Sequence, residues 1–281
     1  MRDQATSADR LRDIHEQLQQ GVHALTTSDD WQRALSFAAR FHAYSFGNAL
    51  LIQAQRPEAT LVAGFQRWRE LGRHVRRGEH GIAILAPIVA RRHDAENDTG
   101  DEPERVVRFF KVAHVFDVSQ TDGNELPRTV FADRLTSGDH RDRELFVRLA
   151  DSIRADGWTV ETVPPSTLAV HGRETNGITV YPARSVQVRN DLAPAQAFKT
   201  LAHERAHALL HDGTRAAREL VECEAESAAY IALCALGIDA GAYSLGYVAG
   251  WSRGDAKIVQ TAGRNALAAA QRILAALEVS E

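Results

Sequence analysis

Two histidines and a glutamate stand close together in the segment His203-Glu204-Arg205-Ala206-His207. On a helix, residues four positions apart project from nearly the same face, so both imidazoles could bind one metal ion at about 2.1 Å. Glu204 would lie one position around the helix, where its carboxylate can take a proton from a water on the metal. The pattern predicts a Zn²⁺ site with His203 and His207 as ligands and Glu204 as the catalytic base. The alternative is a pair of surface histidines on an ordinary helix.

Two imidazoles leave a zinc ion short of ligands, so the site requires a third protein ligand. The downstream segment VECEAESAAY carries Glu222, Glu224 and Glu226 beside several alanines. Carboxylates on a largely apolar helix are costly to bury without a cation, so one of the three should bind the metal. The other two would be solvated or would hydrogen-bond the histidines.

Other residues near the motif fit less specific roles. His211 lies eight residues after His203, which is about 12 Å of helix rise, so one ion cannot bind both. We expect His211 to be a cation at the helix end or a residue at the rim of the site. Cys223 and Cys234 are eleven positions apart and lack a ligand-like spacing, so we expect two small buried side chains.

Local patterns predict the elements that would position these residues. Pro194 follows Asn190-Asp191, apolar spacing continues to Leu210, and Asp212-Gly213 then ends the segment, which together predict a helix that carries the motif. Apolar periodicity and turn residues predict the remaining elements. Helices are expected at 8–26, 31–40, 48–55, 143–155, 220–236 and 265–277, and strands at 82–85, 109–118, 158–163 and 178–181.

Composition limits the class of protein. The 281 residues include 44% hydrophobic residues, enough for one large core or two smaller ones. The net charge is -4, so any contact with nucleic acid must come from a local basic patch. Two cysteines argue against a disulfide scaffold, and no long uncharged apolar run appears. From the charged, polar first residues we expect no secretory signal. We expect a cytoplasmic protein with no membrane contact.

The C-terminal half resembles a known group of enzymes. The stretch TLAHERAHALLH, followed by ECEAESAAYIALCALGI, is similar to the zincin peptidase domains of the ImmA/IrrE and ArdC-associated group, from roughly Leu145 onward. The segment from Tyr243 to Trp251 also matches this group. The resemblance implies a small zincin fold with an active-site helix beside a short mixed sheet. Its E-A-x-x-small pattern implies Glu224 as the third ligand, with Glu226 as the second choice.

The N-terminal half contains a local excess of basic residues interleaved with the aromatic residues Phe65 and Trp68. The arginines are Arg67, Arg69, Arg73, Arg76, Arg77, Arg91 and Arg92. Arginine pairs with phosphate, and flat aromatic rings stack on unpaired bases, so this composition is compatible with single-stranded DNA binding. A basic, solvated face is the alternative.

The order of residues in this half resembles the N-terminal domain of ArdC-type plasmid antirestriction proteins, over about Trp31 to Pro127. The matching segments are Y-S-x-x-N-x-x-L-I, W-x-x-x-G-R-x-V-x-x-G-E-x-G-I and F-D-x-S-Q-T. The resemblance implies binding to single-stranded DNA. Tyr44 and Asn48 fall in the first motif, although they fit equally well as buried residues that join helices. From side-chain chemistry we expect DNA contacts from these two and from Trp68, Arg73, Arg76 and Arg77.

The sequence therefore predicts an α+β protein with a DNA-binding domain at 1–130 and a zincin-like domain at 141–281. One hypothesis is a zinc peptidase tethered to single-stranded DNA, which cleaves a protein found there. A second is a non-catalytic antirestriction protein that shields DNA and uses zinc for stability, and a third is a regulator that sequesters a partner. Glu204 favours the enzyme, because a purely structural zinc site needs no base beside it.

Overall fold

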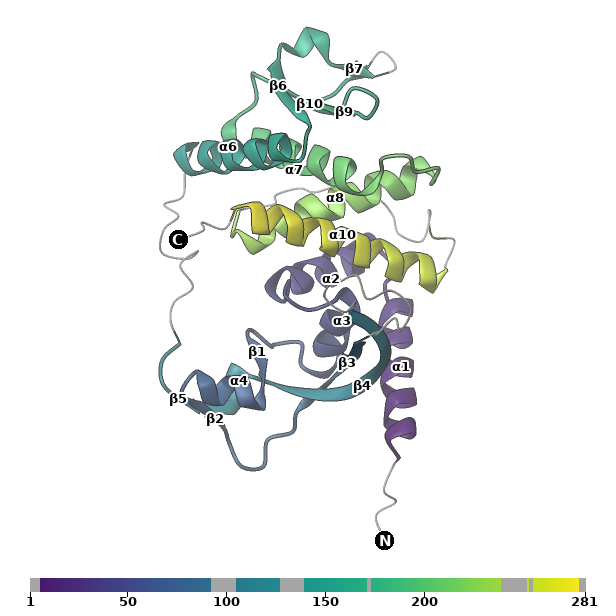
Figure 1. Ribbon diagram of the computed structural model, residues 1–281, viewed down its shortest axis with the longest axis vertical. Coiled ribbons are helices and arrows are strands. Elements are labelled where there is room, and N and C mark those ends of the chain that lie inside the picture. The colour runs from purple at the N-terminus through teal and green to yellow at the C-terminus, as the bar shows by residue number, and fades with distance from the viewer. Residues whose placement is uncertain are drawn as a thin grey trace, which may run out of the picture. The chain divides into compact units, whose positions relative to one another are not determined.

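The computed structural model describes residues 6–91, 105–126, 139–170, 173–238, 252 and 255–277, which combine helices with short sheets (Figure 1). They form two compact units. The first unit comprises Met1–Gly21 and Leu50–Glu125, and the second comprises Val22–Ala49 and Leu126–Glu281. The segment 243–251, which matches the zincin group in sequence, lies outside the described residues.

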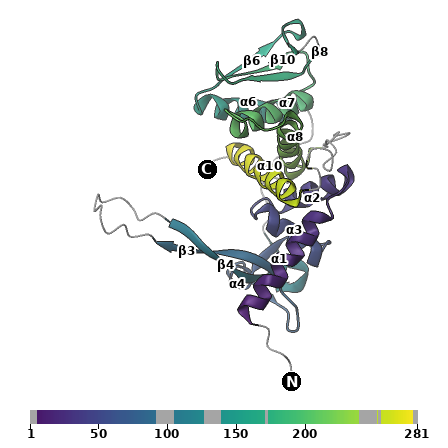
Figure 2. The same ribbon diagram turned by 90° about the vertical axis from the view of Figure 1, so that its right-hand side faces the viewer.

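The first unit is built on a three-stranded antiparallel sheet in the order β1-β4-β3. Strand β1 pairs only with the last residues of β4, so most of β3 and β4 forms a two-stranded ribbon that extends beyond it (Figure 2). The elements are α1 (Ser7–His23), the end of α3 (Phe46–Gln55), β1 (Val62–Gly64), α4 (Phe65–Glu70), β2 (Arg73–Val75), β3 (Ile82–Arg91), β4 (Arg105–Asp117), η1 (Val118–Gln120) and β5 (Thr121–Gly123).

Polar groups in the core of the first unit are matched by hydrogen bonds, as burial requires. Asp117 is 1% exposed, and its Oδ2 accepts hydrogen bonds from the backbone N–H groups of Thr60 at 2.8 Å and Leu61 at 3.1 Å. Its other oxygen accepts from the backbone of Ser119 at 2.9 Å. Gln120, also buried, donates to the carbonyl of His80 at 2.8 Å. This network connects the end of β4 to the segment that precedes β1.

The second unit contains a mixed sheet in the order β6-β10-β9, in which β10 is parallel to β6 and antiparallel to β9. In Figure 1 this sheet lies against α6 and α7, and α8 and α10 follow on the other side of these helices. The elements are α2 (Ser28–Arg40), α6 (Asp139–Ala155), β6 (Thr159–Val163), η2 (Pro165–Thr167), β7 (Ala169–Val170), β8 (Arg173–Glu174), β9 (Gly177–Val180), β10 (Ser185–Arg189), α7 (Pro194–Leu210), α8 (Arg218–Ala235) and α10 (Ala256–Leu277).

Helix α7 is the central element of the second unit. It begins at Pro194, as the sequence predicts, because proline fits the first turn, where its missing N–H has no partner to lose. Gly213 follows its end with φ 72°, a backbone conformation that glycine adopts without strain. The helix packs against α6, α8, α10 and β9, and its buried apolar residues include Phe198, Leu201 and Ala206. The motif therefore sits in a rigid environment.

Helix α2 belongs to the second unit although it lies early in the chain. Thr27 caps it, and a capping box with Asp30 satisfies the first turn, so the helix begins three residues before its expected start at Trp31. The fully buried Trp31 donates its Nε1 hydrogen to Oγ of Ser227 on α8 at 2.9 Å. The hydroxyl of Tyr230 lies 2.7 Å from Oγ of Ser36. These contacts fix α2 against α8.

None of the helices within the described residues is long and apolar enough to span a membrane.

Candidate metal centre

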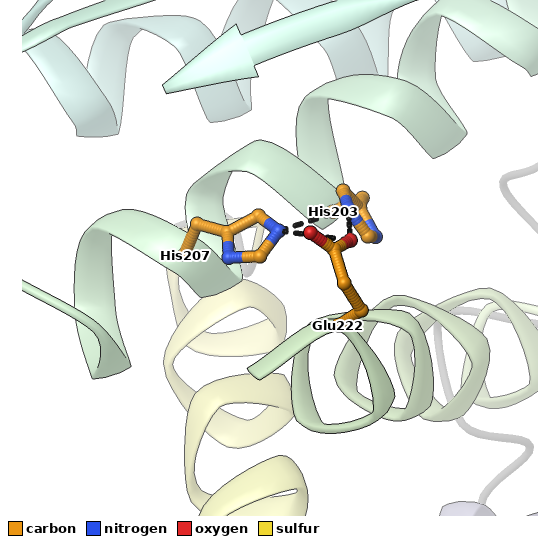
Figure 3. A group of neighbouring side chains, drawn as sticks. All are labelled: His203, His207 and Glu222. Atoms are coloured by element: carbon orange, nitrogen blue, oxygen red, sulfur yellow. Dashed lines mark hydrogen bonds and ion pairs between the residues drawn. The ribbon is translucent and has the colours of Figure 1, made fainter. Parts of the chain in front are cut away.

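Three potential ligands converge between α7 and α8 (Figure 3). Nε2 of His203 and Nε2 of His207 lie 3.0 Å apart. Oε2 of Glu222 lies 3.6 Å from the first nitrogen and 3.7 Å from the second. A triangle with these sides has a centre about 2 Å from each corner, which matches the length of a zinc–ligand bond. Within the described residues, this is the one group of at least three acidic, histidine or cysteine side chains with metal-ligand spacing.

The electrostatics of the group also suit a cation. Burial lowers the pKa of His203, but the nearby carboxylates of Glu222 and Glu226 outweigh burial and raise this pKa to about 10. Oε2 of Glu226 lies 2.9 Å from Nδ1 of His203. The two histidines, His203 first, hold the pKa of Glu222 well below its ordinary value. Two carboxylates against the partly buried imidazole of His203 concentrate negative charge, which a divalent ion would neutralise.

The structure brings His203 and His207 together as expected but does not bring Glu224 to them. Glu224, expected as the third ligand, points its Oε2 toward Nε2 of His211 at 3.0 Å. Its Oε1 accepts a hydrogen bond from the side chain of Asn265 at 2.9 Å. In the structure Glu222, and not Glu224, faces the two imidazoles, because Glu222 and Glu224 are two residues apart and so face different sides of α8. Glu226, the second choice, contacts the opposite nitrogen of His203.

The candidate base Glu204 is buried and is held by strand β9. Thr179 lies with its Oγ1 2.7 Å from Oε2 of Glu204 and donates a hydrogen bond to it. Gly177 packs so closely that a Cβ there would lie 2.9 Å from Oε1 of Glu204 and 2.7 Å from Cγ2 of Thr200. The small residue and the hydroxyl therefore fix the carboxylate in one orientation.

Tyr181 follows β9 and is electrostatically coupled to the same group. Burial raises its pKa first, and the charges of Glu204, Glu222 and Asp212 raise it further, to about 12. Its hydroxyl is therefore protonated at neutral pH and is a hydrogen-bond donor.

The residues expected to contact DNA are not all available for that role. Trp68 is 0% exposed and donates its Nε1 hydrogen to the carbonyl of Phe116 at 2.9 Å, so it cannot stack on a base. Arg73 donates to Oγ1 of Thr121 at 2.8 Å and to its carbonyl at 2.9 Å. These two expectations came from side-chain type alone, and the structure instead uses both residues to hold the first unit together.

The remaining candidates divide between the two units. Arg76 is exposed but pairs with Glu79 at 2.7 Å and Asp122 at 3.3 Å, whereas Arg77 is exposed on the same turn. Tyr44 and Asn48 belong to the second unit, where Asn48 is buried and Tyr44 is partly buried, so both fit the alternative of residues that join helices.

Sequence reasoning did not name Thr179 or Asn265, and it gave Glu222 and His211 only general roles. The contacts of these four residues join elements that are distant in the chain. The helical period offered one usable signal. Glu222 and Glu226 are four residues apart, so both face the same side of α8, and both approach His203.

Comparison with known proteins identifies the N-terminal part. Residues 6–116 match the family described as the N-terminal domain of anti-restriction factor ArdC. This confirms the resemblance expected for the N-terminal half of the chain.

The relatives extend over more of the chain. An uncharacterized protein of Bacillus anthracis is 25% identical over 258 residues, which cover 80% of this chain and 43% of the relative, so the chain spans less than half of that protein. Two crystal structures of the antirestriction ArdC protein from the R388 plasmid, one metal-free and one Mn(II)-bound, are each 20% identical with a TM-score of 0.48. Both matches cover 84% of this chain, and they cover 86% and 85% of those chains.

Proposed function

We propose that the second unit is a metal-dependent peptidase, in which His203, His207 and Glu222 bind a divalent cation and Glu204 is the general base. The observation that carries the proposal is the convergence of two imidazole nitrogens and one carboxylate oxygen within 3.7 Å of one another. Both imidazoles belong to α7, the helix that also presents Glu204. Two nitrogens and an oxygen are the ligand set of many catalytic zinc sites.

The two imidazoles and the carboxylate indicate which ions fit the site. Imidazole with carboxylate suits zinc and also other first-row divalent ions such as manganese, so we propose Zn²⁺ as the first candidate and Mn²⁺ as the second. When bound, the cation would supply Lewis acidity that acidifies water and polarises a substrate carbonyl. The half-exposed position of Glu222 leaves the group open to solvent on one side.

The chain's own groups supply the rest of the chemistry. Glu204 accepts a proton from water and returns it to the amine that leaves when the peptide bond breaks. Thr179 keeps the Glu204 carboxylate oriented through the 2.7 Å hydrogen bond, and the buried surroundings limit its rotation. Tyr181, with its pKa raised to about 12, is available as a donor to negative charge that develops on the substrate oxygen.

The first unit would bring this site to DNA. Its family is named for an anti-restriction factor, which supports a role on DNA in the first unit. We propose that it binds single-stranded DNA and that the peptidase cleaves a protein associated with that DNA, because tethering raises the local concentration of such a substrate. Exposed side chains available for DNA contacts include Arg77, Lys111, Phe109 and Phe110.

The decisive experiment compares cells that express the native chain with cells that express Glu204→Gln. The amide keeps the size of the side chain but cannot act as a base, so new protein N-termini should appear only with the native chain, as measured by proteomics. Purified Glu204→Gln should retain its metal and its affinity for oligonucleotides. Unchanged biological activity and identical proteomes would instead favour a non-catalytic protein that shields DNA.

A further inference from the structure

A row of buried polar side chains runs from His207 away from the three converging ligands. Nδ1 of His207 lies 3.0 Å from Nδ1 of His211, which is the residue after the last turn of α7. Nε2 of His211 lies 3.0 Å from Oε2 of Glu224 on α8. Oε1 of Glu224 accepts a hydrogen bond from Asn265 on α10 at 2.9 Å. His207, His211 and Glu224 are 7%, 4% and 6% exposed, so solvent does not substitute for these contacts.

The donors and acceptors in this row can be assigned in only one consistent way for neutral rings. The carboxylate of Glu224 accepts, so Nε2 of His211 must carry its hydrogen. The neutral ring of His211 then offers a lone pair at Nδ1, which accepts from Nδ1–H of His207. The neutral ring of His207 is left with its lone pair on Nε2. That atom is the one that faces His203 and Glu222.

We propose that Glu224 and His211 form a relay that sets the tautomer and orientation of His207, so that its Nε2 lone pair is aimed at the cation. Asn265 holds the far end of the relay by orienting the Glu224 carboxylate. The three residues are positioning residues and not metal ligands. The inference rests on the metal site of the proposed function. It adds the residues that hydrogen-bond a metal ligand, and such residues generally orient the ligand and raise its basicity.

The relay explains why Glu224 is buried without being a ligand. A buried carboxylate needs partners, and here both of its oxygens have one on a different helix. It also assigns His211 a function that its place at the helix end does not suggest. The row links α7, α8 and α10, so the direction of the His207 ring depends on the packing of three helices.

Substitutions separate the relay from the ligands. His211→Phe removes the acceptor for Nδ1–H of His207, whereas His211→Asn places an amide oxygen near the position of the lost Nδ1 and should restore that acceptor. Glu224→Gln removes the charge that fixes the His211 tautomer. Glu222→Gln removes a proposed ligand and is the reference for loss of the metal. Glu161→Gln, on the exposed side of β6, is a control for removing one carboxylate of the same unit.

The measurements are the Zn²⁺ affinity, by competition with a chromophoric chelator, and the absorption spectrum of bound Co²⁺. We expect His211→Phe and Glu224→Gln to weaken Zn²⁺ binding by about 10- to 100-fold. The absorption of bound Co²⁺ should keep its native intensity in both variants, because all three proposed ligands remain. His211→Asn should recover most of the affinity lost in His211→Phe. Glu222→Gln should lower the affinity further than either and change the Co²⁺ spectrum.

Two results would overturn the relay while leaving the metal site intact. Native-like Zn²⁺ affinity in both His211→Phe and Glu224→Gln would mean that the row only stabilises the fold. A changed Co²⁺ spectrum in Glu224→Gln, with a native spectrum in Glu222→Gln, would make Glu224 the ligand. Failure of the native chain to bind Zn²⁺ or Co²⁺ would overturn the proposed function together with the relay. Absence of proteolysis in a chain that shows the expected affinities would overturn the peptidase alone.

Discussion

Oγ1 of Thr179 on strand β9 lies 2.7 Å from Oε2 of Glu204 on helix α7, and the threonine donates the hydrogen bond. Along the chain, β10 and the loop that precedes Pro194 separate the strand from the helix, and in the fold the two elements pack against each other. The proposed base is therefore oriented from outside its own helix. This relationship makes the edge of the sheet part of the proposed catalytic arrangement.

Gly177→Ala should displace Glu204 without removing any ligand. The new Cβ would lie 2.7 Å from Thr200 and 2.9 Å from Glu204, so one of these side chains must move. We expect a loss of about 1–3 kcal/mol in the free energy of unfolding, because overpacking a buried site forces side chains from their preferred positions. Urea denaturation would measure this loss, and Zn²⁺ affinity should be retained. Gly21→Ala, where a Cβ meets only ordinary contact, is the matched control.

Metal binding should become tighter as the pH rises. In the metal-free protein the pKa of His203 is about 10, since the carboxylates of Glu222 and Glu226 outweigh the effect of burial. Below that pH the metal must displace a proton from His203, so the apparent affinity should rise about tenfold per pH unit through the neutral range. Calorimetry in buffers of different ionisation enthalpy would count the released proton. Binding with no proton release at neutral pH would contradict the prediction.

Asp117 should make the first unit sensitive to acid. Burial raises the pKa of Asp117, but hydrogen bonds from Ser119, Thr60 and Leu61 outweigh burial and hold it below 3.8. Because the folded pKa is the lower one, its contribution is present above about pH 4 and is lost as the pH falls through the folded pKa. Asp117→Asn should therefore lower the free energy of unfolding at neutral pH. The loss should be smaller at about pH 3, where the native carboxylate is partly protonated. Urea denaturation at both pH values would measure this, with the exposed Glu125→Gln as the control.

Charge reversal should separate the arginines that could bind DNA from those that hold the fold. Arg77→Glu should weaken binding to a single-stranded oligonucleotide several-fold and should flatten the dependence of the affinity on salt. Arg73→Ala should mainly lower stability, because it removes hydrogen bonds to Thr121 and to the β5 backbone. Arg10→Glu, on the exposed side of α1, is the control for a general change in charge. Equal losses in Arg77→Glu and Arg10→Glu would exclude a specific contact at Arg77.

Local signals in the sequence located most elements of the fold. The helix that carries the motif has the expected bounds, Pro194–Leu210, because proline and glycine act at its ends regardless of tertiary contacts. Helix α10 begins at Ala256, nine residues before the expected start. Strand β10 and the short helix α4 were not expected. Both are short, and their stability depends on neighbours that local patterns do not reveal.

The candidate site could be predicted only in part. The spacing of His203 and His207 fixes their common face, and the structure brings their Nε2 atoms to 3.0 Å. The choice among three glutamates was different, because it depends on the rotation of α8 about its axis relative to α7. Packing between the helices sets that rotation, and it directs Glu222 to the imidazoles and Glu224 to His211.

The division of the chain also limits how its parts can be exchanged. Val22–Ala49 contributes α2 to the second unit, where Trp31 is fully buried and bonded to Ser227. A fragment that starts at residue 141 would uncover the apolar surface of α8 that α2 occupies, and it should aggregate unless that helix is supplied in trans. Recombination that moved the metal centre into another protein as a working module would therefore need to carry two separate stretches of the gene.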